Sequence, residues 1–162
     1  MRRKDREITD FEEMLRIMEK CDVCRIAMMD EDHPYPYILP LNFGMERKGE
    51  QITFYFHGAH EGRKYELMQR HPQVSFEMDC EHLLFLDEEK GSCSMAYESV
   101  IGHGRMEIVT DEEEKRKGLH LIMEHYGRGD FAFNPASVGL TTVFKLEMEG
   151  CTGKRRPGPR KA

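Results

Sequence analysis

One short stretch, FYFHGAHEGRK (residues 54–64), gathers residue types that could bind an anion. An aromatic run is followed by two glycines and then by two cations at the start of a helix-like segment: His57, Gly58, Gly62, Arg63 and Lys64. Backbone amides at a helix start favour negative charge, and the two cations can bind phosphate oxygens. The alternative is an ordinary capped helix with a solvated basic first turn.

The spacing within this stretch excludes a nucleotide P-loop. That motif requires four residues between its glycines, followed by Lys and by a Ser or Thr that holds magnesium. Here three residues separate Gly58 from Gly62. Arg63 intervenes, and Tyr65 occupies the hydroxyl position. GHGRME (102–107) has only the first two glycines of a dinucleotide fingerprint, and strand-like residues follow them, so a Rossmann motif is excluded as well.

His57 is the candidate for proton chemistry beside this anion site, because an imidazole donates, accepts or titrates near neutral pH. The alternative is a hydrogen-bonded structural histidine. The sequence offers no Ser-His-Asp or Cys-His order. Cys21 and Cys24 form a CxxC pair, but neither a second pair nor an HxxxH supplies further zinc ligands. We therefore expect no metal site and favour a bound cofactor that brings its own chemistry.

Composition limits the class and location of the protein. The 162 residues suit one domain, and a net charge of -6 argues against a nucleic-acid-binding surface. No apolar run approaches the roughly 18 residues that span a bilayer. MRRKDRE is not followed by an apolar segment, and five cysteines, an odd number, fit a reducing compartment. We expect a cytoplasmic protein that binds neither nucleic acid nor membrane.

The elements that position this stretch are mostly strands joined by hairpin-length turns. Apolar periodicity predicts helices at 10–20, 61–70 and 112–126, and strands at 24–29, 35–45, 51–57, 73–79, 94–109 and 141–149. Pro36 and Pro40 place the second strand at an edge, an end or a bulge, and residues 81–93 are expected to form a loop or an excursion from the sheet. The prediction is a single mainly β domain with peripheral helices (α+β) over 1–150, followed by a basic, flexible tail over 151–162.

The chain resembles the FMN-binding split-barrel proteins related to pyridoxamine 5'-phosphate oxidase, and among them the branch of 5-nitroimidazole resistance proteins. The matching stretches together span residues 21 to about 156: CRIAMMDEDHPYPYILPLNFGM, ITFYFHGAHEGRKYELMQRHPQVSFEMD, YESVIGHGRMEIV and EGCTGKRR. The resemblance implies a six-stranded antiparallel split barrel. It also implies a homodimer that holds FMN at the subunit interface.

The resemblance further implies which residues bind FMN. Positions that line the flavin ring match Pro40, Leu41, Asn42, Tyr55, Phe56, His57 and Gly58. Positions that bind the phosphate match Arg63 and Lys64, which follow the glycine turn at Gly62. Ser99 and Val100 match the strand that reaches the flavin from the partner subunit, and Lys154 matches a position near the site.

Two functional hypotheses stay open. The first is an FMN-dependent oxidoreductase that passes electrons through flavin N5 to a small acceptor such as a nitroaromatic, with His57 donating a proton or polarising the nitro group. The second is a flavin- or haem-binding protein without turnover, acting as a sensor or sequestering module.

The chain has no Trp and lacks the C-terminal Trp and Arg pattern of true pyridoxamine phosphate oxidases. Related split barrels also bind haem or a deazaflavin.

Overall fold

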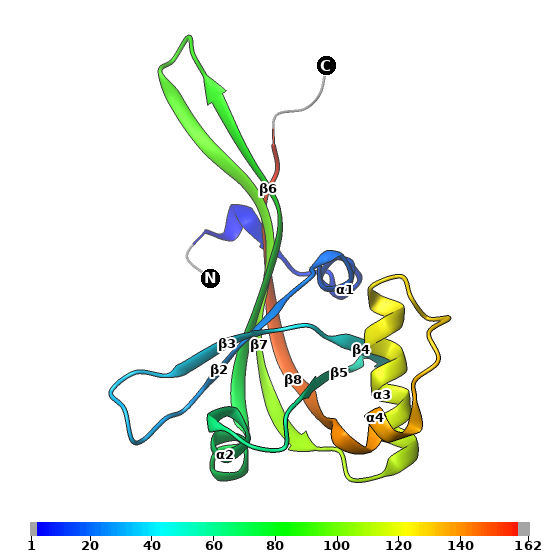
Figure 1. Cartoon of the computed structure of the whole chain (residues 1–162). Helices are drawn as coiled ribbons and strands as arrows, with labels where there is room; N and C mark the ends of the chain where they lie inside the picture. Colours follow the sequence, from blue (N-terminus) through cyan, green and yellow to red (C-terminus); the bar gives the residue numbers. More distant parts are fainter. Residues whose placement is uncertain (1–2, 159–162) are drawn as a thin grey trace. The chain divides into compact units, whose positions relative to one another are not determined.

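The computed structural model describes residues 3–158, in which eight strands form one sheet with peripheral helices (Figure 1). The strands are β1 (Glu7–Ile8), β2 (Cys24–Met28), β3 (Tyr37–Leu41), β4 (Gly44–Lys48), β5 (Gln51–Gly58), β6 (Gln73–Asp87), β7 (Ser92–Ile108) and β8 (Thr142–Arg156). The helices are η1 (Lys4–Arg6), α1 (Phe11–Lys20), α2 (Arg63–Arg70), α3 (Glu112–His125) and α4 (Pro135–Leu140). None of the helices in the described residues is long and apolar enough to cross a membrane.

The hydrogen-bonded strand order is β3-β2-β6-β7-β8-β5-β4, and β1 pairs with β8 outside this path. The pairings of β2 with β3, β4 with β5, β5 with β8 and β1 with β8 are all antiparallel. This arrangement confirms the predicted split-barrel class, with eight strands rather than the expected six. β3 lies at an edge of the sheet, as its prolines predicted, because proline cannot donate to a ladder.

The described chain divides into two compact units. Within the described residues, unit 1 is formed by residues 3–21, 77–101 and 151–158, and unit 2 by Asp22–Phe76 and Gly102–Gly150. The long strands β6, β7 and β8 each contribute residues to both units.

In unit 2, α3 packs against β4 and β5. β4 approaches α3 closely because position 44 is glycine. A Cβ there would collide with the α3 backbone at Leu121 and Ile122. The core beneath α3 is apolar and consists of Tyr55, Val109, Leu119, Ile122, Val138 and Val143. This packing fixes the end of β5, where the stretch 54–64 begins.

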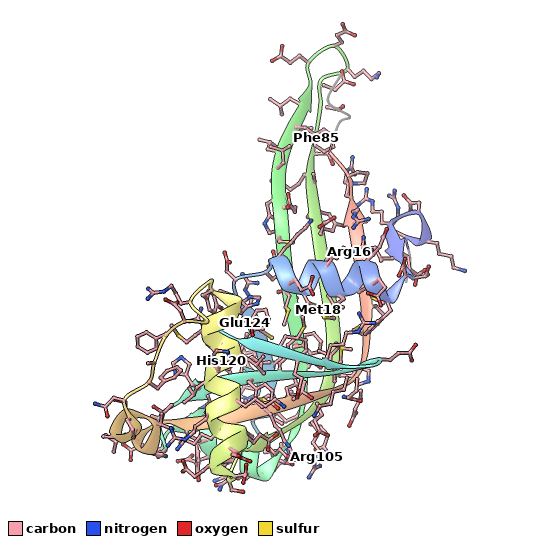
Figure 2. All side chains as sticks on the ribbon, turned by 90° about the vertical axis from the view of Figure 1, so that its right-hand side faces the viewer. Arg16, Met18, Phe85, Arg105, His120 and Glu124 are labelled. Carbon is pink, nitrogen blue, oxygen red and sulfur yellow. The ribbon has the colours of Figure 1, made fainter. Side chains whose placement is uncertain are left out.

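In unit 1, α1 starts where the Asp10 carboxylate accepts a hydrogen bond of 2.8 Å from the Glu12 amide. Its apolar face is buried, as the periodicity predicted, and Met18 is fully buried while Arg16 on the other face is exposed (Figure 2). β1 joins this unit through its register with β8, in which Ile8 pairs with Gly153.

The single strand expected over 35–45 is in fact two strands, β3 and β4. The break occurs at Asn42 and Phe43, where the hydroxyl of Tyr126 accepts hydrogen bonds of 3.0 Å from the Asn42 amide group and 3.3 Å from the Phe43 backbone N–H. The Phe43 backbone N–H thus bonds to a side chain instead of a neighbouring strand, and the ladder is interrupted there.

Residues 81–93, expected to form a loop or an excursion, are not a loop, because β6 continues to Asp87 and β7 begins at Ser92. The two strands are joined by a tight turn, in which Gly91 has φ 60°. Most side chains of β6 beyond residue 80 are exposed, and a ribbon exposed on both faces has no apolar alternation to reveal it.

The tail expected from residue 151 begins later, because β8 continues to Arg156. β8 pairs with β1 here, and Glu7 lies opposite Lys154. This pairing provides hydrogen-bond partners for backbone N–H and C=O groups that would otherwise bond to water. Residues 159–162 of the expected tail lie outside the described residues. The short helix α4 was not predicted at all.

Candidate functional site

The end of β5 carries the predicted aromatic run to the edge of unit 2. β5 pairs with β8 so that Phe56 lies opposite Phe144 and Gly58 opposite Thr142. Because side chains alternate across a strand, Tyr55 and His57 point to one face and Phe56 to the other. Phe56 is fully buried, whereas His57 is exposed.

Lys64 lies over the backbone of the strand end. A Cβ at Gly58 would collide with the Lys64 Nζ, so this approach requires glycine. The Nζ is also 5.2 Å from the centre of the Phe144 ring, a distance typical of a cation–π contact. Lys64 is half-buried, and burial lowers its pKa. Among residues 3–158, no carboxylate lies within ion-pair distance of this ammonium group.

The first turn of α2 adds backbone donors beside this lysine. Gly62 precedes the helix with φ 104° and provides no side-chain cap. By contrast, the amides at the starts of α1, α3 and α4 are capped by Asp10, Asp111 and Asn134. The first amides of a helix have no acceptor one turn back. In α2 the Tyr65 amide donates to the Gly62 carbonyl at 3.0 Å, so the amides of Arg63 and Lys64 are the ones that favour an anion.

Arg63 points away from this position and binds carboxylates instead. Its Nε donates to Asp30 Oδ2 at 3.0 Å, and its Nη2 contacts Asp30 Oδ1 and, at 2.9 Å, Asp32 Oδ2. The side chain of Asp30 is only 5% exposed. Hydrogen bonding to Arg63 lowers the pKa of both aspartates. Arg63 therefore ties the start of α2 to the turn between β2 and β3.

His57 lines an apolar cavity of about 250 Å³ between the end of β5, α3 and α4. The other lining residues include Leu119, Ile122, Met123, Phe133 and Val138. Desolvation, followed by the nearby charge of Lys64, lowers the pKa of His57. The imidazole is therefore neutral at pH 7 and can donate or accept a hydrogen bond in the cavity.

The sequence also agrees with a known family along most of its length. The family model described as pyridoxamine 5'-phosphate oxidase matches residues 10–155. The chain belongs to the pyridoxamine 5'-phosphate oxidase family. This family assignment confirms the resemblance that the sequence alone indicated.

Solved structures agree with the family assignment. A candidate 5-nitroimidazole antibiotic resistance protein from Bacteroides thetaiotaomicron is 33% identical, with a TM-score of 0.80 over 92% of this chain and 86% of that one. A flavocytochrome from Azotobacter vinelandii is 21% identical (TM-score 0.79, 98% and 73% covered). An FAD and haem binding protein from Mycobacterium smegmatis is 17% identical (TM-score 0.77, 97% and 77% covered). A search among curated proteins found no match.

The remaining residues predicted for the family's cofactor site divide between the two units. In unit 2, Pro40 and Leu41 end β3, and Asn42 is held by the hydroxyl of Tyr126. Ser99, Val100 and Lys154 belong to unit 1, where Val100 is fully buried and the Lys154 Nζ is 5.4 Å from the centre of the Tyr97 ring. The structure thus brings together the predicted residues around 57–64.

The side chain of Tyr55, predicted to line the flavin ring, is buried in the core beneath α3. Its hydroxyl donates toward Glu114 at 3.3 Å and Glu46 at 3.4 Å. Burial and these carboxylates raise the pKa of Tyr55. Sequence analysis missed this charged cluster, which also includes Lys117 and Lys145, because its members come from four separate elements.

A second missed contact lies in the turn before α2. The His60 Nδ1 is 2.5 Å from the Oγ1 of Thr142, a buried residue at the start of β8. This contact fixes the turn between Gly58 and Gly62, and no local signal in the sequence links the two residues. Within the described part of the chain, no group of three or more His, Cys, Asp or Glu side chains could hold a metal ion.

Proposed function

We propose that this protein binds FMN and transfers electrons from it to a small flat acceptor such as a nitroaromatic. One observation carries the cofactor assignment: Lys64 is a half-buried cation that has no carboxylate partner among the described residues, and it lies beside the uncapped first turn of α2. A flavin phosphate would supply the missing negative charge, and a charge-assisted hydrogen bond contributes about 1.5–3 kcal/mol.

The residues around Lys64 have separate roles in the proposed phosphate site. Gly58 leaves room for the ammonium group, and Gly62 exposes the helix amides. Arg63 holds the helix start in place through Asp30. We therefore assign the phosphate mainly to Lys64 and the α2 amides, and assign to Arg63 the role of positioning them.

Similar proteins support a flavin. The flavocytochrome and the FAD and haem binding protein share the fold of this chain. A bound flavin supplies reversible electron and hydride transfer, which no side chain can provide. The protein's contribution is to bind the phosphate, shield the ring and present polar groups such as the Asn42 amide, whose orientation Tyr126 fixes.

The cavity beside His57 supports a small flat molecule as the electron acceptor. Its volume of about 250 Å³ and apolar lining suit a small flat molecule, and the neutral imidazole can hydrogen-bond to a nitro group. The similar candidate resistance protein, whose name refers to 5-nitroimidazoles, favours this class of acceptor.

We further propose a homodimer, with Ser99 and Val100 of each copy directed to the flavin of the other. The support comes from the β6–β7 hairpin of unit 1, which exposes Leu83, Leu84, Leu86 and Met95 by 44–62%. Leu84 and Leu86 alternate onto the same face of β6, and exposed apolar side chains that share a face typically mark an interface.

The test begins with the absorption spectrum of the protein as purified, which distinguishes bound flavin from haem and from empty protein. The flavin is then reduced under anaerobic conditions with NADPH or dithionite and mixed with a 5-nitroimidazole. We expect reoxidation of the flavin and consumption of the drug. A reduced flavin that neither nitroimidazoles nor other small acceptors reoxidise would favour the binding protein without turnover.

A further inference from the structure

A second group of cations lies in unit 1, and it comes from both ends of the chain. The net charge of the whole chain is -6, yet MRRKDR (1–6) and KRRPGPRK (154–161) are strongly basic. The antiparallel pairing of β1 with β8, with Glu7 opposite Lys154, joins the described parts of these two segments. An acidic protein thus concentrates positive charge in one place.

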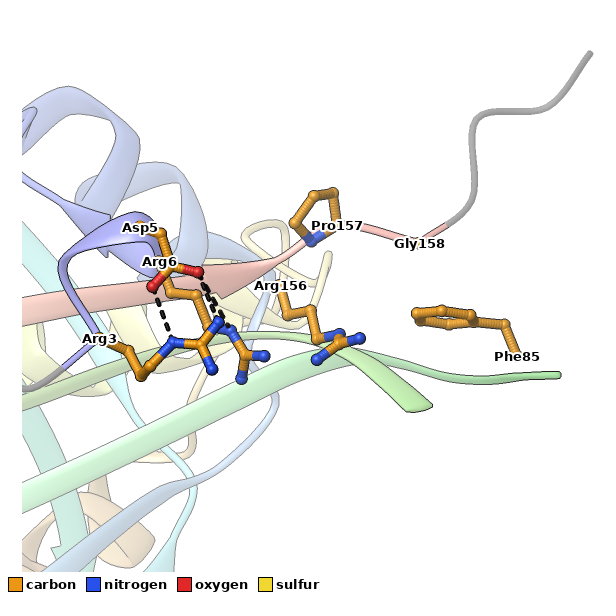
Figure 3. A pocket seen from close by; sticks show the side chains of 7 residues that line it. All are labelled: Arg3, Asp5, Arg6, Phe85, Arg156, Pro157 and Gly158. Atoms are coloured by element: carbon orange, nitrogen blue, oxygen red, sulfur yellow. Dashed lines mark hydrogen bonds and ion pairs between the residues drawn. The ribbon is translucent and has the colours of Figure 1, made fainter. Parts of the chain in front are cut away.

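Three of these cations, Arg3, Arg6 and Arg156, line a groove of about 430 Å³ (Figure 3). Its walls include Arg3, Asp5, Arg6, Phe85, Arg156 and Pro157. The guanidinium carbon of Arg156 is 5.5 Å from the centre of the Phe85 ring. The groove therefore combines three guanidinium groups with an aromatic ring and one acidic side chain.

Protein carboxylates neutralise these cations only in part. Asp5 binds Arg3 through two hydrogen bonds of 2.8 and 2.7 Å. Arg6, whose side chain is only 19% exposed, lies 4.0 Å from the same carboxylate. Within residues 3–158, no carboxylate lies within ion-pair distance of Arg156.

The neighbouring residues on β8 show that this excess of positive charge is confined to one face of the strand. Arg155, which points to the opposite face, binds Glu98 at 2.5 Å and Glu13 at 3.0 Å. Lys154 shares its face with Arg156 and has Tyr97 as its neighbour. Hydrogen bonding to Lys154, and then to Arg6, lowers the pKa of the Tyr97 hydroxyl.

We propose that this groove binds a nucleotide, with its phosphates on Arg6 and Arg156 and its base stacked beside Phe85. Guanidinium groups bind phosphate oxygens in pairs and also stack on flat rings, and both properties are present here. The groove volume lies within the range of small-ligand sites. This site belongs to unit 1 and is independent of the phosphate position assigned to Lys64.

Calorimetric titration of the full-length protein, as purified with its cofactor, tests the proposal with ADP, pyrophosphate and adenosine as probes. We expect ADP to bind more tightly than either fragment. Arg6→Ala and Arg156→Ala should each weaken ADP binding about tenfold or more, as expected for the loss of a charge-assisted hydrogen bond. Phe85→Ala should weaken ADP binding but not pyrophosphate binding.

Two control variants test whether the loss of ADP binding is specific to the groove residues. Arg16→Ala removes an exposed arginine from α1 in the same unit and should leave ADP affinity unchanged. Lys64→Met should weaken flavin binding without affecting ADP, which separates this proposal from the proposed flavin site. Thermal unfolding of each variant verifies that it is folded.

Three calorimetric results would overturn the proposal. The first is the absence of ADP binding, and the second is ADP binding that neither arginine substitution weakens. The third is pyrophosphate binding as tight as that of ADP, which would reduce the groove to a bare anion patch. A single-stranded oligonucleotide that displaces ADP at far lower concentration would also overturn it, because the groove would then be part of a polyanion surface.

Discussion

The ammonium group of Lys64 lies in the space that a side chain at Gly58 would occupy. This relationship joins the end of β5 to the first turn of α2, and it explains why a glycine stands directly after His57. The backbone approach allows a half-buried cation to sit beside uncapped helix amides. The proposed phosphate site therefore depends on the absence of a side chain as much as on the presence of a charge.

Gly58→Ala should weaken flavin binding while leaving the fold intact. The added methyl group displaces the flexible end of Lys64, and a Phe144 ring carbon 3.3 Å away limits other movement. We expect flavin affinity, measured by fluorescence titration, to fall about tenfold, the loss of one charge-assisted bond. Gly129→Ala, where the nearest atoms are 3.7 Å away, is the control and should bind flavin normally.

Asp30→Asn should lower the melting temperature at pH 7, because Arg63 loses its ionised partner. Folding lowers the pKa of Asp30, so its contribution to stability is present above the unfolded pKa of about 3.9 and is lost as the pH falls through the folded value. The difference between variant and parent should therefore shrink below pH 4. Asp130→Asn, at an exposed residue, should show a much smaller difference at pH 7; an equal loss would refute a special role for Asp30.

His57→Asn should retain flavin but reduce nitroimidazoles about a hundredfold more slowly, the lower end of the usual range for loss of a proton donor or acceptor. The lowered pKa of His57 keeps the imidazole neutral at pH 7. If the neutral form is active, kcat of the parent falls on acidification below that pKa, and the variant lacks this decline. Identical pH profiles of kcat in parent and variant would assign His57 a structural role.

Gly118→Ala should destabilise the protein by about 1–3 kcal/mol, the usual cost of overpacking. The new methyl group would lie 2.7 Å from a Tyr55 ring carbon and 3.1 Å from a Val143 side-chain carbon. Gly139→Ala, in α4, meets nothing within 4 Å and should stabilise by up to about 1 kcal/mol. Urea unfolding of both variants measures the contrast, and a shift of the same sign in both would contradict the packing described for α3.

Leu84→Glu should shift the proposed dimer towards monomer. This side chain is 58% exposed on the β6–β7 hairpin, and a charge there would be costly to bury in an interface. Light scattering at several concentrations measures the mass. Leu140→Glu, at a leucine 77% exposed on α4, is the control; dissociation by that substitution and not by Leu84→Glu would place the interface elsewhere.

Local patterns predicted much of the fold. The apolar face of α1 and the strand before His57 follow from periodicity alone, and both were confirmed. The outer part of β6 was missed because a two-sided exposed ribbon does not alternate. The start of α4 carried an overlooked signal, Asn134 as cap followed by Pro135 at the first helical position.

The candidate site was only partly predictable, for a physical reason. The order of Gly58, Gly62 and Lys64 in the sequence indicated an anion site. The partner of Arg63 could not be inferred, because Asp30 is distant in sequence and reaches it only when α2 packs beside the turn after β2. Long-range ion pairs depend on tertiary structure, and a single sequence does not encode them in any local pattern.

The most direct test of the account is the equilibrium affinity for FMN of Lys64→Met, compared with the parent and with Arg105→Ala, which removes an exposed arginine from β7 (Figure 2). The account predicts a Kd for FMN that rises at least tenfold in Lys64→Met and stays unchanged in Arg105→Ala. An unchanged Kd in a correctly folded Lys64→Met would contradict the proposed phosphate site.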